Sequence, residues 1–138
     1  MKRHPSLVPL SRDHHESLIL SRLLQKDAPA YKGLPSTQDE KREYAIRHFD
    51  SHIKPHFLKE EKLYHSLLHY ERLQTHITQV LNDHQLLERL FDNIREAATG
   101  EDLHALGVLL EKHIRFEERE LFPLMEIVCT PDELAGWE

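Results

Sequence analysis

The sequence is short of the residues on which several structural classes depend. It holds one cysteine, Cys129, in 138 residues, which excludes an intramolecular disulfide and fits a reducing compartment. Glycine occurs four times, and Gly33, Gly100 and Gly136 stand where helices are expected to end. No apolar run reaches the roughly 18 residues of a membrane span, and no signal sequence is recognisable. We therefore expect one soluble, cytoplasmic domain over residues 1–138.

Positive charge is also scarce. The formal net charge is −6 at pH 7, and no long stripe of lysine and arginine offsets it, so we expect neither a nucleic-acid partner nor a membrane partner. Histidine, in contrast, occurs 12 times. A purely structural domain has no obvious need for so many imidazoles, so the composition favours a chemical role for some of them.

Apolar residues recur at the period of an α-helix through most of the chain. The pattern predicts helices over about residues 10–28, 37–69, 71–98 and 101–128, and a short helix over 131–137. Pro55 and Pro123 lie inside two of the long helices, where they predict kinks. Four long amphipathic helices with short connections predict an all-α fold, an antiparallel up-down four-helix bundle with an N-terminal arm and a short C-terminal helix.

The segment over residues 56–61 returns in near copy at residues 113–118. In each copy a histidine precedes a glutamate by four residues: His56 with Glu60, and His113 with Glu117. On a helix this spacing places imidazole and carboxylate on one face, one turn apart. A single pair of this kind is typical of a solvated helix surface. The repetition favours two halves of one site.

Two further histidines are related in the same way. Asp13 and His14 follow Leu10 as Asp83 and His84 follow Val80, and both histidines lie on the apolar stripe of their helices. The neighbouring His15 points about a quarter turn away, and we rank it second to His14 as an inward-facing ligand.

His52 precedes His56 by one helical turn. It could be a ligand, a partner of a ligand or a residue lining a pore, and the sequence leaves these alternatives open. Ser17 and Ser21 are small residues below His14, and they either leave space near a site or allow two helices to pack closely.

The combined set is one histidine plus one His-x-x-x-Glu motif in each half of the chain. It comprises His14, His56, Glu60, His84, His113 and Glu117. Two histidines and a carboxylate per metal leave coordination positions open, which suits non-haem iron, with manganese or zinc as possible substitutes. The two glutamates are well placed to bridge two iron ions, whereas a single zinc ion would not need six such ligands.

At these residues the sequence resembles the hemerythrin-like family, also called the HHE cation-binding domain. The resemblance rests on Asp13-His14, residues 56–61, Asp83-His84 and residues 113–123, and it covers nearly the whole chain. It implies a di-iron centre bridged by the two motif carboxylates and an oxygen species. It also implies a small-molecule ligand such as dioxygen, peroxide or nitric oxide. Oxygen-carrying hemerythrins have a further histidine where this chain has Val80, which argues against a dedicated carrier.

Several functions stay open at this stage. The leading hypothesis is a metal-binding protein that binds, senses or reacts with such a small molecule. The alternatives are an oxidoreductase that reduces peroxide or repairs iron–sulfur clusters, an iron-handling protein, and an interaction protein whose bundle needs metal for stability. Tyr44, Tyr64 and Phe57 are expected either to line the pocket or to be ordinary core residues.

Overall fold

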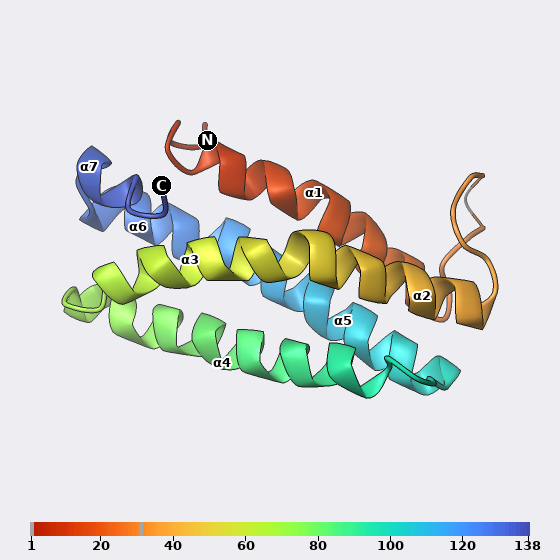
Figure 1. Cartoon of the computed structure of the whole chain (residues 1–138). Helices are drawn as coiled ribbons and strands as arrows, with labels where there is room; N and C mark the ends of the chain where they lie inside the picture. Colours follow the sequence, from red (N-terminus) through yellow and green to blue (C-terminus); the bar gives the residue numbers. More distant parts are fainter. Residues whose placement is uncertain (1, 31) are drawn as a thin grey trace.

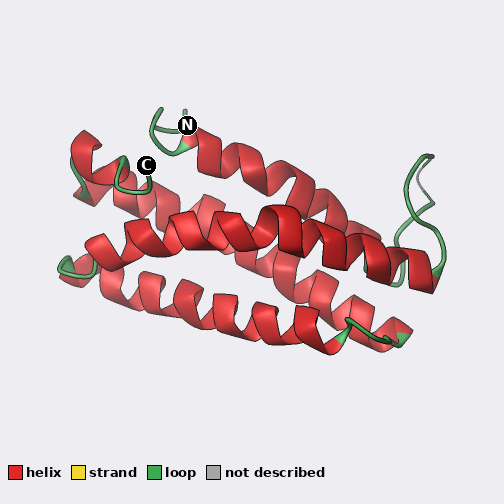
Figure 2. Ribbon diagram, viewed as in Figure 1, coloured by secondary structure: helices red, strands yellow, loops and turns green. Residues whose placement is uncertain are grey.

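The computed structural model of the chain describes residues 2–30 and 32–138 and contains helices but no strand in these residues (Figure 2). The expectation of an all-α protein is therefore confirmed. Met1, in the expected N-terminal arm, and Tyr31 lie outside the described residues. Within the described part of the chain, every helix is too short or too polar to cross a membrane.

Two of the four long helical stretches are continuous and two contain a π-helical turn. The elements are α1 (Val8–Leu23), α2 (Gln38–His48), η1 (Phe49–Ile53), α3 (Lys54–Ser66), α4 (Glu71–Asn93), α5 (Gly100–Phe116), η2 (Glu117–Leu121), α6 (Phe122–Val128) and α7 (Pro131–Leu134). Threonines begin three of them: Thr37, Thr99 and Thr130 each form a capping box with the acidic residue three positions later. These boxes satisfy backbone N–H groups that a helix start leaves free.

Four of the five predicted helices end early. Those expected to end near residues 69 and 137 end at Ser66 and Leu134, and the other two fall short by more. The first ends at Leu23 rather than near residue 28. Beyond it the N–H of Gln25 donates to the carbonyl of Arg22 and that of Ala28 to the carbonyl of Gln25, so the chain continues in tighter turns. The third ends at Asn93 rather than near residue 98. There the Arg42 guanidinium donates to the carbonyl of Arg95 at 2.5 Å, so a side chain from α2 satisfies a group that a longer helix would have bonded.

The predicted proline kinks take the form of π turns. Pro55 and Pro123 are each the second residue of an α-helix that follows η1 or η2. At the junctions, the N–H of Lys54 donates to the carbonyl of Phe49, and the N–H of Phe122 to that of Glu117. Proline lacks an N–H and clashes with the carbonyl four residues earlier, and a turn that is one residue wider relieves both problems.

The four long stretches lie lengthwise beside one another (Figure 1). They are α1, α2 with η1 and α3, α4, and α5 with η2 and α6. The N-terminal arm and α7 lie at the same end of the molecule (Figure 1). There the indole of Trp137 donates to the carbonyl of Ser6 at 2.7 Å, which ties the two ends of the chain together.

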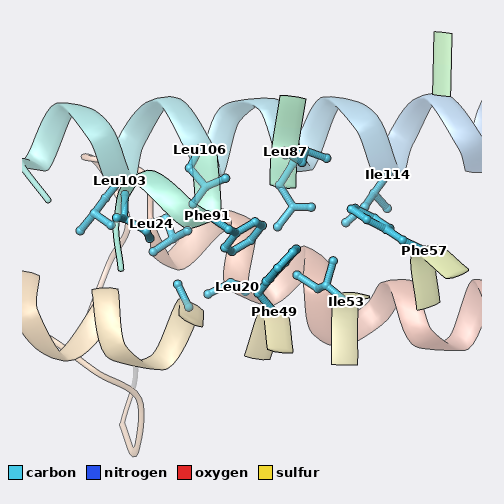
Figure 3. Close-up of a cluster of buried hydrophobic side chains, with 13 residues drawn as sticks. Leu20, Leu24, Phe49, Ile53, Phe57, Leu87, Phe91, Leu103, Leu106 and Ile114 are labelled. Carbon is cyan, nitrogen blue, oxygen red and sulfur yellow. The ribbon is translucent and has the colours of Figure 1, made fainter. Parts of the chain in front are cut away.

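The apolar core consists of two clusters. The first contains Leu20, Phe57, Leu87 and Ile114 and is centred on the stacked rings of Phe49 and Phe91, whose centroids are 4.4 Å apart (Figure 3). The second lies toward the chain ends and contains Leu10, Tyr64, Val80, Leu121 and Phe122, among others. On α1, α3, α4 and the α5–η2 stretch, residues of the two clusters flank the predicted site residues in sequence. The clusters therefore enclose a layer of buried polar side chains.

Gly107 allows α1 and α5 to approach closely. A Cβ atom at this position would lie 2.5 Å from the carbonyl oxygen of Ser21 and 3.0 Å from the Cβ of Leu24. Ser21 is fully buried, and its hydroxyl bonds back to Leu18 in its own helix. Of the two alternatives for this serine, the structure supports close helix packing.

We expect Gly107→Ala to destabilise the protein by about 1–3 kcal/mol, the usual cost of overpacking, although alanine is the better helix former. The measurement is urea denaturation of the two proteins. Gly100→Ala is the matched control, since its Cβ would meet only the Gln38 side chain, at 3.4 Å. Equal stability of both variants would mean that the α1–α5 crossing is looser than described.

Candidate metal centre

The structure brings all six predicted residues into the polar layer between the two apolar clusters. They come from α1 (His14), α3 (His56 and Glu60), α4 (His84), α5 (His113) and the first position of η2 (Glu117). Each is buried, with at most 6% of its surface exposed. Their ability to bind metal remains a prediction from this arrangement.

The four imidazoles form two pairs of the same geometry. The ring centroids of His14 and His56 are 4.8 Å apart at an angle of 65°, and those of His84 and His113 are 4.9 Å apart at 66°. The Nε2 atoms of His14 and His56 are 3.1 Å apart. The sequence repeat therefore corresponds to a structural repeat, with one pair of imidazoles from each half of the chain.

The two glutamates lie between the imidazole pairs. Glu60 Oε2 is 3.2 Å from His56 Nε2, and its other oxygen, Oε1, is 3.3 Å from His84 Nε2. Glu117 Oε1 is 2.7 Å from His113 Nε2 and 3.7 Å from His14 Nε2. Each carboxylate therefore faces histidines of both halves, as a bridging ligand must.

The structure also decides between the neighbouring histidines. His14 points into the layer, whereas His15 is exposed. His52 is not a member of the cluster: its Nε2 lies 3.2 Å from the backbone carbonyl of Asp13. His52 therefore contacts Asp13, which in turn contacts His56, and this position matches neither a ligand nor a direct partner of a ligand.

A carboxylate from another helix faces the Nδ1 atom of every imidazole. Glu118 lies 3.0 Å from His14, Asp13 3.0 Å from His56, Glu61 2.9 Å from His84, and Asp83 3.3 Å from His113. An acceptor at Nδ1 favours the tautomer in which Nδ1 carries the hydrogen and Nε2 presents its lone pair to the centre.

Reasoning from the sequence missed the role of these four carboxylates. The signal was present, because each one is adjacent in sequence to a predicted ligand and takes part in the repeat. Adjacency nevertheless suggests the wrong partner: Asp13 precedes His14 but contacts His56, and Asp83 precedes His84 but contacts His113. Neighbouring residues of a helix point in different directions, so each carboxylate serves the adjoining helix.

Of the three aromatic residues considered for the pocket, two reach the site. The Tyr64 hydroxyl donates to both glutamates, at 3.1 Å to Glu60 Oε2 and in a short contact to Glu117. The Phe57 ring stacks on His84 with centroids 3.8 Å apart. Tyr44 instead stacks on His48, away from the six residues.

Four polar atoms of the layer are buried without a well-aligned hydrogen bond. Glu60 Oε1, His84 Nε2, His113 Nε2 and Glu117 Oε1 have no hydrogen-bond partner among the described residues, although short distances separate some of them. Buried polar atoms are normally paired, and an unpaired buried carboxylate is costly. A cation between these oxygen and nitrogen lone pairs would satisfy all four atoms, so the donor set fits a metal.

In the metal-free protein, protons stabilise this layer. Burial opposes a charged imidazole, but Glu60 and Asp13 raise the pKa of His56 to about 9, and Glu117 and Asp83 do the same for His113. Burial likewise opposes the charge of Glu60, but His56 holds the pKa of this carboxyl well below its usual value. Metal binding must therefore displace protons from the histidines.

We expect the metal-free protein to lose stability as the pH rises from 6.5 to about 9. The raised pKa values of His56 and His113 stabilise the folded state fully below the ordinary value of 6.5, and this contribution is lost as the pH passes about 9. The measurement is the urea midpoint of chelator-treated protein across this range. His65→Gln is the control, because His65 is exposed and should leave the profile unchanged. A flat profile for the unaltered protein would contradict the described charges.

Comparison with known proteins adds one finding. Neither a curated protein sequence nor a solved structure gives a match. The family model described as "Hemerythrin HHE cation binding domain" matches residues 8–125, which include all six residues of the layer. This match covers most of the chain and agrees with the paired His-x-x-x-Glu motifs. The chain therefore belongs to the hemerythrin HHE cation-binding family.

Proposed function

We propose that this protein holds a non-haem di-iron centre in an antiparallel four-helix bundle of the hemerythrin type, and that the centre binds, senses or reacts with dioxygen, peroxide or nitric oxide. The observation that carries the proposal is the convergence of buried imidazole and carboxylate donor atoms in two groups, Glu60, His84, His113 and Glu117 in one and His14, His56 and Glu60 in the other. Six ligands from two repeats suit a metal pair better than a single ion.

Each side chain has a distinct task in this proposal. His14 and His56 would hold one ion, His84 and His113 would hold the other, and Glu60 and Glu117 would be shared between them. Two imidazoles with shared carboxylates leave positions open, which favours iron, with manganese or zinc as substitutes. The four outer carboxylates keep the imidazoles in the binding tautomer. When bound, iron supplies the redox chemistry and the open positions for a small molecule.

The place of Val80 favours a reactive centre over a reversible carrier. Its side chain is fully buried in the same apolar cluster as Tyr64 and Ile77. Valine cannot ligate, so an iron ion held by His84 would lack the further imidazole that a histidine at this position could offer. The partner that we propose is accordingly a small molecule. The net charge of −6 supports neither nucleic acid nor an anionic membrane surface as an alternative.

A second candidate, peroxide reduction, is favoured by Tyr64. Its phenol is fully buried and donates to both glutamates, and these carboxylates, together with burial, raise its pKa well above the usual value. A phenol that stays protonated beside the centre could donate its hydrogen to a small molecule held there if it exchanged its hydrogen bond to the glutamates. Consumption of peroxide by the iron-loaded protein over many cycles, with a chemical reductant present, distinguishes this activity from simple binding.

We expect the protein purified in air to contain two iron ions per chain, with near-ultraviolet bands that change on addition of azide. Glu60→Ala and Glu117→Ala should each lower the content of both ions, because each carboxylate is shared. Metal analysis and the optical spectrum provide the measurement. Glu120→Ala is the matched control, since Glu120 lies exposed in η2 beside the centre. Full loading of either bridging variant would refute the sharing of its carboxylate.

Val80→His tests the open position. The added imidazole should alter the optical spectrum and slow oxidation of the reduced protein in air by about tenfold, the low end of what a changed ligand environment produces. Val80→Leu is the control, since it changes the volume without adding a ligand. If the unaltered reduced protein already holds dioxygen reversibly for long periods, the argument against a carrier is wrong.

A further inference from the structure

A second group of histidines lies outside the centre, between α1 and the α2–η1 stretch. His48 and His52 are half-buried, with ring centroids 4.8 Å apart. The Nε2 of His48 is 3.2 Å from the hydroxyl of Ser17, and that of His52 is 3.2 Å from the carbonyl of Asp13. Both rings are thus anchored to α1 through one nitrogen each.

The π turn η1 helps to keep these rings in line with the centre. In an α-helix, residues four apart drift by about 40° around the axis, so three histidines at this spacing would spiral away from one face. The turn of η1 is about one residue wider, which reverses part of this drift. His48, His52 and His56 consequently all face α1, as their contacts with Ser17 and Asp13 show.

Asp13 connects this pair to the centre. Its backbone carbonyl is the partner of His52, and its carboxylate oxygen Oδ2 lies 3.0 Å from Nδ1 of His56. The carboxylate is 29% exposed, whereas His56 is 6% exposed. A series of polar groups of decreasing exposure therefore connects the half-buried His48 and His52 to His56, a buried residue of the centre.

The pair has the chemical character of a metal ligand. Burial and the nearby His52 lower the pKa of His48 to about 4, so this imidazole is neutral at physiological pH. The carboxylate of Glu16 acts on His48 from α1 in the opposite direction. Within the described residues, the Nδ1 atoms of His48 and His52 have no hydrogen-bond partner. Neither is among the buried atoms that lack a partner, so both are accessible to solvent. Neutral imidazoles are preferred ligands of divalent transition metals.

We propose that His48 and His52 form an outer binding site for a divalent transition-metal ion, from which the ion passes along Asp13 to the central site. The inference rests on the proposed function, because it assigns an entry route to that centre. The outer site is weaker than the central one, since it offers fewer ligands and is more exposed to water.

The test uses the metal-free full-length protein and Co²⁺, whose visible absorption reports imidazole ligation. Equilibrium dialysis should find two tightly bound ions and a third, weaker one. In His48→Gln/His52→Gln the third ion should be lost. The two central ions should reach the same final content but bind about tenfold more slowly, the low end of the on-rate increase that a raised local ion concentration produces. Stopped-flow absorption measures this rate.

His65→Gln/His69→Gln is the matched control, because it removes another pair of exposed histidines four residues apart and should change neither quantity. Circular dichroism checks the fold of each variant. The inference is overturned if His48→Gln/His52→Gln keeps the third ion or loads at the original rate. Two tight ions without a third also overturn it and leave the proposed function standing, whereas no tight ions refute the proposed function itself.

Discussion

Two glutamates that are completely buried, without a lysine or arginine beside them, impose the main constraint on this structure. Glu60 and Glu117 lie between two apolar clusters, where an isolated carboxylate would be prohibitively unstable. Four imidazoles and one phenol, drawn from four helical stretches, surround them. The helices must therefore pack so that every one of these side chains reaches the same layer. A metal pair would complete the compensation that the protein groups provide only in part.

Polarity changes in steps from this layer to the solvent. The buried glutamates contact buried imidazoles, and these in turn contact carboxylates that are between 22 and 29% exposed. The outer carboxylates retain part of their hydration, so they keep their charge at modest cost while they orient the imidazoles. This arrangement gives a buried site fixed geometry without burying further uncompensated charge.

The two halves of the site resemble each other in their ligands but differ in what covers them. On one side, Glu118 also accepts from the hydroxyl of Ser11 and lies 3.6 Å from Arg3, which the N-terminal arm places over the ring of Phe122. On the other side, Phe57 stacks directly on His84. The arm therefore contributes to one half only. The two repeats of the sequence are therefore surrounded by different side chains.

The sequence by itself determined the all-α class and the two His-x-x-x-Glu motifs of the polar layer, because both follow from local periodicity, whereas the choice of His14 over His15 came from the tertiary structure. Apolar residues at helical spacing predict helices, and a histidine four residues before a glutamate shares its face wherever the helix packs. Only the tertiary structure decided that Asp13 serves His56, that His52 faces the Asp13 carbonyl, and that Pro55 and Pro123 follow π turns. Those outcomes depend on the rotation and separation of neighbouring helices, which are set by side chains distant in sequence, such as Gly107 against Ser21.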